Sequence, residues 1–375
     1  MYPAIDVEVQ KRAKLYQRRK RLTGWLGSGL VFLWLLTFYG SGLSDLLAQT
    51  LADRLGWLGS GLSAFAVLFL SVSVLRAPFD YKNDFLIEKE YGFSTQSRQD
   101  WFKDLLKGWL ISLVILSVAI TFGLWALERF PVYWWLVVGL GYFLLVIVLA
   151  NLFPVLVLPL FYKLKPLDAP ALQDKIEKLL QRARLRAGGI YEMVASAKTT
   201  KENAMLAGLG KTKRIILWDT LLHNRTVEEV EAVVAHEVGH SYHLHLWKLL
   251  FFQGVMIMVE LILLDRMLLQ IAPRFAPEQR TFSDTLALLP VMMVLFAVLS
   301  FLLNPIIQAI SRRFERQADG FAFEATDRPG TLMRFFTDIA NRQLEDAYPH
   351  PLVKFFYYNH PPLGERIAFA ERWRR

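Results

Sequence analysis

The sequence predicts a mostly α-helical protein that crosses a membrane several times, and three observations lead to this fold class. First, 54% of the 375 residues are hydrophobic, the mean hydropathy is +0.30 and only 21% are charged, which is too apolar for a water-soluble globule. Second, the apolar residues are gathered in blocks about as long as a bilayer-spanning helix of ~20 residues. Third, the chain has no cysteine, which excludes a disulfide scaffold, a thiolate nucleophile and a Cys-ligated metal.

Six stretches are candidates for the membrane spans. Five of them contain no Asp, Glu, Lys or Arg over the ~18 residues that a span needs: 24–44, 55–75, 108–127, 130–162 and 285–311. The sixth, 249–270, is apolar but includes Glu260 and two further charged residues. Pro154 and Pro159 should break the second part of 130–162, because proline removes a helix hydrogen bond. That part is therefore either a bent interfacial segment or a seventh span.

The distribution of basic residues predicts the orientation. Residues 1–23 hold seven of the Lys and Arg residues, and the loop at 76–107 again carries Lys and Arg, so the positive-inside rule places the N-terminus in the cytoplasm. Four crossings then return 163–246 to the cytoplasmic side, and two more return everything after Arg312 to that side. The formal charge of +9 is concentrated in the tail instead of along a groove, so we expect no nucleic-acid partner. The partner is the lipid bilayer, in a bacterial inner membrane or the endoplasmic reticulum membrane.

The chain is expected to divide into five regions. These are a basic cytoplasmic tail (1–23), an N-terminal membrane region of four or five spans (24–162), an α+β segment (163–246), two further spans (247–311) and a C-terminal segment (312–375). Within the α+β segment, apolar periodicity predicts a helix over 170–187 that Gly188 and Gly189 end. Residues 190–194 resemble a strand, and 203–219 resemble a hairpin with a polar turn.

The motif His236-Glu237-Val238-Gly239-His240 carries the chemistry. Thr226 and Glu229 form a capping box before an apolar-periodic run, so the motif should lie inside a helix. Positions i and i+4 share one face of a helix, which allows His236 and His240 to bind one zinc ion with Glu237 beside it. We expect one Zn²⁺ per chain and Glu237 as the general base of a peptide hydrolysis.

A catalytic zinc also needs a third protein ligand and an open position. His243 lies on the right face, but about one turn beyond the pair, too far along a rigid helix. We therefore expect a distant carboxylate. Glu315 and Asp319 form an E-x-x-x-D pattern on the helix that continues from the last span, on the same side of the membrane as His236. Alone, this pattern is typical of a solvated helix face; beside the zinc motif, we interpret Glu315 as the third ligand and Asp319 as the group that orients a ligand histidine.

The C-terminal Asn359-His360-Pro361-Pro362, followed by Arg366, has two interpretations. A stiff histidine and a permanent cation could stabilise the oxyanion that forms during hydrolysis. Equally, the segment could be only a turn and a helix start. The residues alone do not decide between them.

Together these segments resemble the type I CAAX prenyl proteases, integral-membrane zinc metalloproteases of the gluzincin type. The similar segments follow one another in the family's order over roughly residues 60 to 370: 85–104, 159–167, 201–222, the zinc motif with His245 downstream, 311–319 and 359–367. The resemblance implies six to seven transmembrane helices that form a barrel around a chamber, with a small zincin-type α+β catalytic domain on the cytoplasmic side. Fuller members have seven spans, whereas we count six here.

The resemblance also implies the roles of the site residues. It implies zinc on His236, His240 and Glu315, Glu237 as base and Asp319 in support. His360 and Arg366 would stabilise the tetrahedral intermediate, and Asn203 and Ala204 would form an edge strand where the substrate pairs by strand addition. The substrates would be prenylated CAAX peptides or other membrane-linked polypeptides.

Other functions remain possible on the sequence alone. A quality-control metalloprotease with no prenyl requirement would have the same zinc motif. A noncatalytic membrane scaffold could keep a structural zinc. A transporter built around Glu260 should show inverted repeats, and we find none in the sequence.

Overall fold

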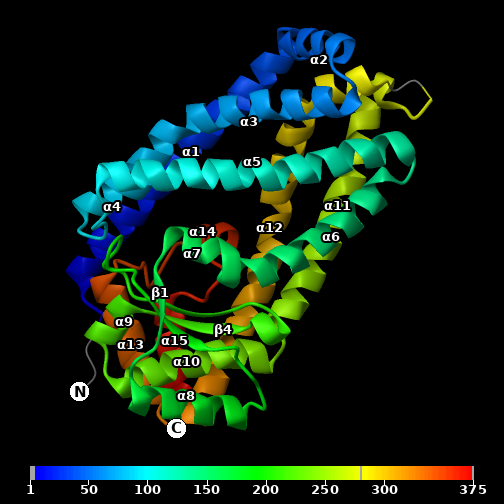
Figure 1. Ribbon diagram of the computed structural model, residues 1–375. Coiled ribbons are helices and arrows are strands. Elements are labelled where there is room, and N and C mark those ends of the chain that lie inside the picture. Colours follow the sequence, from blue (N-terminus) through cyan, green and yellow to red (C-terminus); the bar gives the residue numbers. More distant parts are fainter. Residues whose placement is uncertain (1–4, 279–280, 374–375) are drawn as a thin grey trace.

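A ring of six long helices forms the membrane part of the molecule (Figure 1). The computed structural model describes residues 5–278 and 281–373, so residues 1–4 of the predicted tail and 374–375 lie outside the described part. Along the ring α1 contacts α3, α3 contacts α5, α5 contacts α6, α6 contacts α11, α11 contacts α12, and α12 returns to α1. The bounds are α1 Val7–Gly40, α3 Trp57–Tyr81, α5 Arg98–Arg129, α6 Trp134–Leu152, α11 His245–Ile271 and α12 Phe282–Thr326.

Six helices of the described residues are long and apolar enough to cross a membrane, and each overlaps one of the six predicted spans. Two differences concern where helices begin and end. The basic segment 5–23 is not a separate tail, because α1 begins at Val7 with Asp6 as its N-cap. Pro154 and Pro159 do not end the fourth span. Instead, the helix widens into a π-helical turn (Phe153–Val157) and continues as α7 (Leu158–Phe161), because a π-turn accommodates the missing proline N–H without breaking the helix.

A small sheet and most of the remaining helices cover one end of the ring, whereas α2 lies at the opposite end (Figure 1). The sheet has the strand order β1-β2-β4-β3, with β1 Leu164–Pro166, β2 Ile190–Met193, β3 Ala204–Ala207 and β4 Arg214–Trp218. The predicted strand and hairpin are confirmed; β1 and the parallel pairing of β2 with β4 were not predicted. The other helices are α2 Leu43–Arg54, α4 Ile87–Glu90, α8 Pro170–Arg182, α9 Asp219–Asn224, α10 Val227–Tyr242, α13 Pro329–Arg342, α14 Pro351–Tyr357 and α15 Leu363–Trp373.

Helix α8 is shorter than predicted. It ends at Arg182 and not at residue 187, and Arg184 adopts a positive φ of 52°, so the chain leaves the helix more than one turn before the glycines. Its buried face (Leu172, Ile176, Leu179, Leu180) packs on α10 in the largest hydrophobic cluster. This packing fixes the position of α10 on the side opposite to its histidines.

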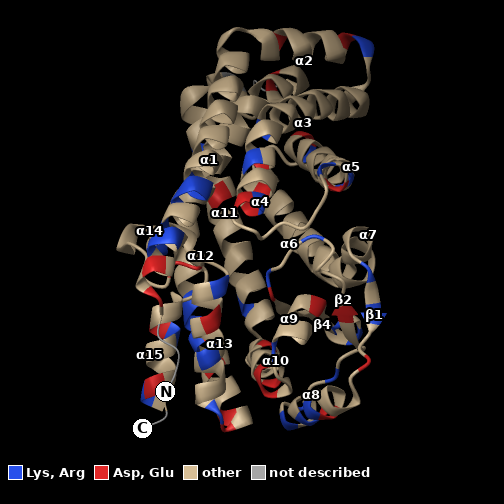
Figure 2. Cartoon of the chain, turned by 90° about the vertical axis from the view of Figure 1, so that its left-hand side faces the viewer, with Lys and Arg blue, Asp and Glu red and all other residues tan. Residues whose placement is uncertain are grey.

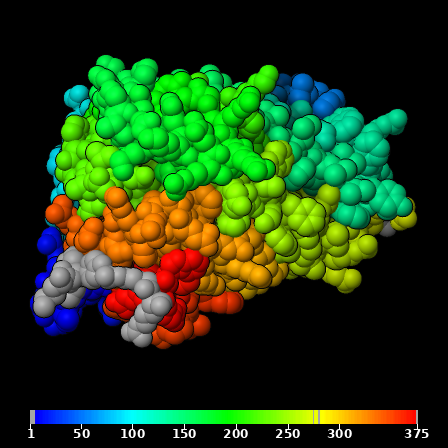
Figure 3. Space-filling view, turned by 90° about the horizontal axis from the view of Figure 1, so that it is seen from below, coloured from blue at the N-terminus to red at the C-terminus, as the bar shows by residue number. Residues whose placement is uncertain are grey.

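Charged residues are concentrated at the end of the molecule that carries α8, α10, α13 and α15 (Figure 2). Seen from that end, residues 160–250 and the segment from 310 onward lie side by side (Figure 3). Two parts of the chain that are far apart in sequence therefore form one polar layer against the ring.

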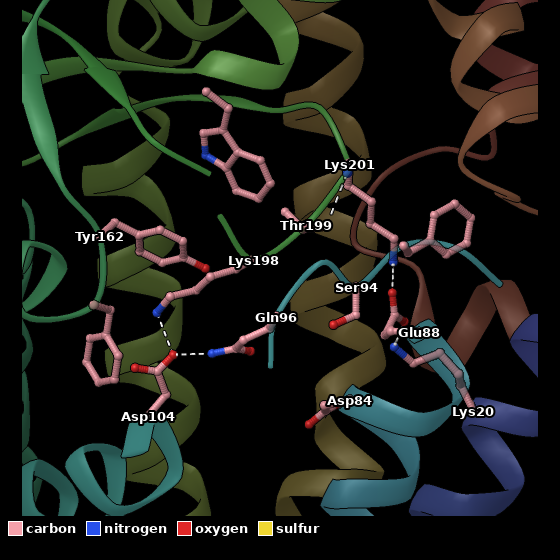
Figure 4. A pocket seen from close by; sticks show the side chains of 13 residues that line it. Lys20, Asp84, Glu88, Ser94, Gln96, Asp104, Tyr162, Lys198, Thr199 and Lys201 are labelled. Atoms are coloured by element: carbon pink, nitrogen blue, oxygen red, sulfur yellow. Dashed lines mark hydrogen bonds and ion pairs between the residues drawn. The ribbon is translucent and has the colours of Figure 1, made fainter. Parts of the chain in front are cut away.

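Ion pairs join this layer to the ring around a cavity of about 360 Å³ (Figure 4). Lys198 Nζ lies 2.5 Å from Asp104 Oδ2 of α5. Lys201 Nζ lies 2.8 Å from Glu88 Oε2 of α4, and Lys20 of α1 binds the same carboxylate at 2.5 Å. Lys198 and Lys201 lie in the segment that leads into β3. Their ion pairs therefore hold this strand in a defined position relative to the membrane helices.

Candidate metal centre

Helix α10 positions the first three residues of the site. Its capping box of Thr226 and Glu229 is present as predicted, and the helix runs through to Tyr242. His236 is buried, with 6% of its surface exposed, while Glu237 and His240 are partly buried. The two histidine Nε2 atoms lie 3.2 Å apart, as the i, i+4 spacing predicts.

Gly239 allows α12 to approach α10 closely. A Cβ atom at this position would lie 3.1 Å from both the Cα and the carbonyl oxygen of Ala318, which is closer than most side chains tolerate. Ala318 itself is fully buried and lies between Glu315 and Asp319. A small residue inside the zinc motif therefore brings the E-x-x-x-D segment of α12 against the histidines.

Glu315 completes a group of three possible metal ligands. One ligand atom each from His236, His240 and Glu315 lie within 4.8 Å of one another. Glu315 Oε2 is 3.3 Å from His236 Nε2, and Oε1 is 3.3 Å from His240 Nε2. Ligand atoms bound at ~2.1 Å in a tetrahedral arrangement lie about 3.4 Å apart, so all three separations fit one zinc-sized ion.

The polar groups of this cluster are incompletely satisfied by the protein. Glu315 Oε2 is buried and, apart from its contact with His236, has no hydrogen-bond partner among the described residues. Burial opposes a charged His236, yet hydrogen bonds to Asp319 and Glu315 outweigh it and raise the pKa of His236 to about 10. The carboxylates therefore create a field that favours a positive charge between them, and the residues fit a divalent metal ion.

Each histidine has a hydrogen-bond partner on its other ring nitrogen. His236 Nδ1 lies 2.9 Å from Asp319 Oδ1. Asp319 is fully buried and accepts two hydrogen bonds from Arg366, at 2.9 Å from Nε and 2.5 Å from Nη2. Arg366 in turn lies over the ring of Phe336, 4.0 Å from its centroid. This arrangement fixes the ring of His236 with Nε2 toward Glu315.

The partner of His240 was missed by the sequence reasoning. His245 Nδ1 is 3.1 Å from His240 Nδ1, and His245 Nε2 is 2.9 Å from Gln317 Oε1. His245 is 1% exposed and its ring stacks on Phe314 at 4.4 Å. From the sequence alone, His245 was identified only as a residue downstream of the zinc motif. Its actual place depends on Leu244, which adopts a left-handed conformation with φ 56° between α10 and α11 and turns the chain back toward His240.

The remaining predicted residues lie around this cluster. His360 Nε2 is 3.2 Å from Glu315 Oε1, and about half of its side chain is exposed. Ala204 begins β3, which is an edge strand in the order β1-β2-β4-β3, and Asn203 directly precedes it. Leu206 of β3 donates its backbone N–H to Glu237, whose pKa is raised, above all by burial. A small cavity of about 70 Å³ lies between β3 and α10 and is lined by Glu237 and His240.

Two models of known protein families match this chain, one for each half. Residues 166–374 match the model of peptidase family M48, which is more than half of the chain. The chain belongs to peptidase family M48. Residues 2–163 match the CAAX prenyl protease N-terminal model, which is described as having five membrane helices. Here that region has four long helices and the shorter α2.

Individual proteins and one solved structure are similar to this chain over most of its length. An uncharacterized metalloprotease of Bacillus subtilis, YhfN, is 31% identical over 310 residues, which cover 82% of this chain and 72% of that protein. CAAX prenyl protease 1 of Saccharomyces cerevisiae is 28% identical over 340 residues, covering 86% and 73%. The crystal structure of S. mikatae Ste24p superposes with a TM-score of 0.83 at 24% identity, over 98% of this chain and 89% of that chain.

These findings confirm the predicted fold class, the resemblance to the CAAX prenyl proteases and the membrane metalloprotease activity. The M48 protein is a multi-pass membrane hydrolase whose family implies a metal. In the part of the chain that the structure describes, His236, His240 and Glu315 form the one group of His, Asp and Glu side chains suited to hold that metal.

Proposed function

We propose that this M48 protein is a zinc-dependent endopeptidase that cleaves peptide bonds near the C-terminus of prenylated, CAAX-type, or other membrane-associated polypeptides. The observation that carries the proposal is the convergence of His236, His240 and Glu315 with Glu237 beside them. Two imidazoles and a carboxylate are a ligand set of catalytic zinc sites. When bound, zinc would polarise the scissile carbonyl and lower the pKa of a water molecule.

Glu237 is the proposed general base. Its burial raises its pKa toward neutral pH. A carboxyl group with such a pKa can take a proton from water and later deliver it to the leaving amine. The N–H of Leu206 holds the carboxylate toward β3. Because β3 is an edge strand, a substrate strand beside Asn203 and Ala204 would present its peptide bond next to Glu237.

His360 and Arg366 have different proposed parts in stabilising the negative oxygen of the tetrahedral intermediate. His360 is half-exposed and lies 3.2 Å from Glu315, so its ring can donate a hydrogen bond to a substrate oxygen. Arg366 uses Nε and Nη2 on Asp319, so it contributes a permanent charge at longer range and keeps Asp319 ionised. Asp319 and His245 hold the two ligand histidines in the required orientation.

We further propose that the N-terminus and both catalytic segments, 163–246 and 312–375, face the cytoplasm from a bacterial inner membrane or the endoplasmic reticulum membrane. Four long helices precede α10 and two lie between α10 and the C-terminal segment. An even number of crossings leaves the N-terminus, α10 and α15 on one side, and the basic start of α1 favours the cytoplasmic side.

The test is cleavage by the purified full-length protein, with Glu237→Gln as the decisive variant. We expect wild-type cleavage to stop when a chelator is added, and Glu237→Gln to lose nearly all turnover while still binding one zinc ion. Glu228→Gln is the matched control, since Glu228 lies on the same helix and is exposed. Full activity of Glu237→Gln would refute the proposal and leave a noncatalytic zinc-bearing scaffold.

The substrate is tested in the same assay with two peptides. One is a prenylated CAAX peptide, and the other is an unmodified fragment of a membrane protein. Cleavage of the first alone supports the CAAX-type function. Cleavage of the second at an equal rate supports a quality-control protease with no prenyl requirement.

A further inference from the structure

A groove of about 730 Å³ runs between α1, α3 and α12. Most of its wall is apolar and comes from all three helices, including Val31, Val72, Val298 and Phe301. No Asp or Glu is among its lining residues. The groove therefore offers hydrocarbon contacts along its length and has no negative charge in its wall.

One end of the groove is basic. Lys20 and Arg21 line it there, and Arg76 lines the groove further along, where its Nη1 lies 3.3 Å from Ser28 Oγ. Lys20 binds Glu88, and Arg76 binds Asp80 through Nε at 3.1 Å. Arg21, in contrast, is half-buried and makes no hydrogen bond or ion pair among the described residues, although its charge acts on Tyr358. A guanidinium with five N–H donors and no partner suits a phosphate or carboxylate oxygen.

The polar residues of the groove come from α1, from α3 and the turn that follows it, and from α14, whereas α12 contributes only apolar side chains. Arg21 lies near the start of the apolar part of α1, and Leu35, at the other end of the groove, is 14 residues further on, a rise of about 21 Å along the helix. Asn83, after α3, lines the groove with a buried Oδ1 that makes no hydrogen bond. The shape and charge together match a molecule with an anionic head and a long hydrocarbon chain.

We propose that this groove binds one anionic phospholipid, with its phosphate at Arg21 and an acyl chain along α1 and α12. Basic pockets between transmembrane helices on the cytoplasmic side are typical sites for anionic lipid heads. The lipid chain of a prenylated peptide fits less well, since it is attached through a neutral thioether. In a phospholipid only a few atoms separate the phosphate from the hydrocarbon chains. In the groove the cations likewise lie next to the apolar wall.

The groove is connected to the catalytic segment through α14. Tyr357 lines the groove, and the ring of Phe356 stacks on Phe301 of α12 at 5.0 Å. His360 follows Tyr357 by three residues. A bound lipid would hold α14 against α12 and so restrict the segment that carries His360.

Gly24→Leu is the variant that tests the site. Gly24 lines the groove, and a Cβ atom there meets no atom within 4 Å, so a leucine side chain begins in open space and extends into the groove. Gly29→Leu is the matched control on the same helix, because Gly29 also has open space at its Cβ and does not line the groove. Arg21→Gln removes the unpaired cation and leaves the apolar wall intact.

The measurement is the number of lipids retained by the purified full-length protein, by native mass spectrometry, after incubation with phosphatidylglycerol or phosphatidylcholine. We expect wild type and Gly29→Leu to retain one phosphatidylglycerol and to prefer it over phosphatidylcholine. Gly24→Leu should lose it, and Arg21→Gln should bind it about fivefold more weakly. The readout does not depend on proteolysis, so it stands whether or not the proposed function is correct.

Two results would overturn the proposal. One is equal retention of both lipids by wild type. The other is undiminished phosphatidylglycerol retention by Gly24→Leu; a raised KM for prenylated peptides in that variant would then assign the groove to the substrate's own chain.

Discussion

Replacing His245 by Phe should weaken metal binding although His245 is not one of the three proposed ligands. If His240 binds the metal through Nε2, its Nδ1 carries the proton and donates it to His245 Nδ1, 3.1 Å away. His245 Nε2 then donates to Gln317 Oε1 at 2.9 Å. Phe keeps the stacking on Phe314 but removes the acceptor for His240.

The size of the effect follows from the lost hydrogen bond. A buried donor left without its partner costs about 1 to 3 kcal/mol, and loss of such an orienting partner lowers metal affinity about 10- to 100-fold. The side chain of His240 is 26% exposed, so water can replace part of the interaction. We therefore expect a loss near the lower limit, about tenfold.

The assay is competition for Zn²⁺ with a chromophoric chelator, together with the absorption spectrum of the Co²⁺-substituted protein. His245→Asn offers an amide oxygen near the position of Nδ1 and should recover part of the affinity, whereas a residue with only a packing role would not distinguish Asn from Phe in this way. Wild-type zinc affinity and an unchanged Co²⁺ spectrum in His245→Phe would refute the reasoning.

Three further predictions concern the surroundings of the site. Asp319→Asn should destabilise the protein by about 3 to 5 kcal/mol in denaturant unfolding, because it leaves the buried Arg366 without its carboxylate; a loss under 1 kcal/mol would contradict this. Gly239→Ala should lower zinc affinity, because its Cβ meets the backbone of Ala318 at 3.1 Å and pushes α12 away; unchanged affinity would show that the helices adjust. Burial opposes ionisation of Asp219, but hydrogen bonds from Ser196, Thr220 and Ala195 lower its pKa below 3.8. The ionised Asp219 therefore stabilises the folded protein above pH ~4, and this stabilisation is lost as the pH falls through the lower folded pKa. Asp219→Asn should reduce the difference in Tm between neutral and acidic pH. An unchanged difference would contradict this prediction.

Local patterns predicted the elements that depend on neighbouring residues. The capping box at Thr226, the i, i+4 histidines and the hairpin that contains β3 all follow from sequence distances of a few residues. Glu315 could be paired with them over a separation of 75 residues from His240 only because the number of membrane spans determines which segments meet on one side.

The features that escaped prediction depend on contacts outside the local pattern. The parallel pairing of β2 with β4 joins strands with β3 between them in the chain, and no periodicity reports such a partner. His245 reaches His240 because one residue, Leu244, takes a left-handed conformation that a non-glycine residue rarely adopts. The proline-rich stretch after Leu152 remained ambiguous because proline can end a helix or, as here, accompany a π-helical turn.

The geometry of the proposed metal centre depends on how the membrane helices pack. Helix α12 extends from the ring, where it contacts α1, α2 and α11, to the site, where it contacts α10. Phe301, which lines the groove, precedes Glu315 on this helix by 14 residues, or about 21 Å, and Pro305 lies between them. Since the two proposed ligand histidines come from α10 and Glu315 from α12, the separation of these helices sets the separation of the ligands. Packing within the bilayer therefore acts directly on the third ligand, and the same helix connects the proposed lipid site to the proposed catalytic site.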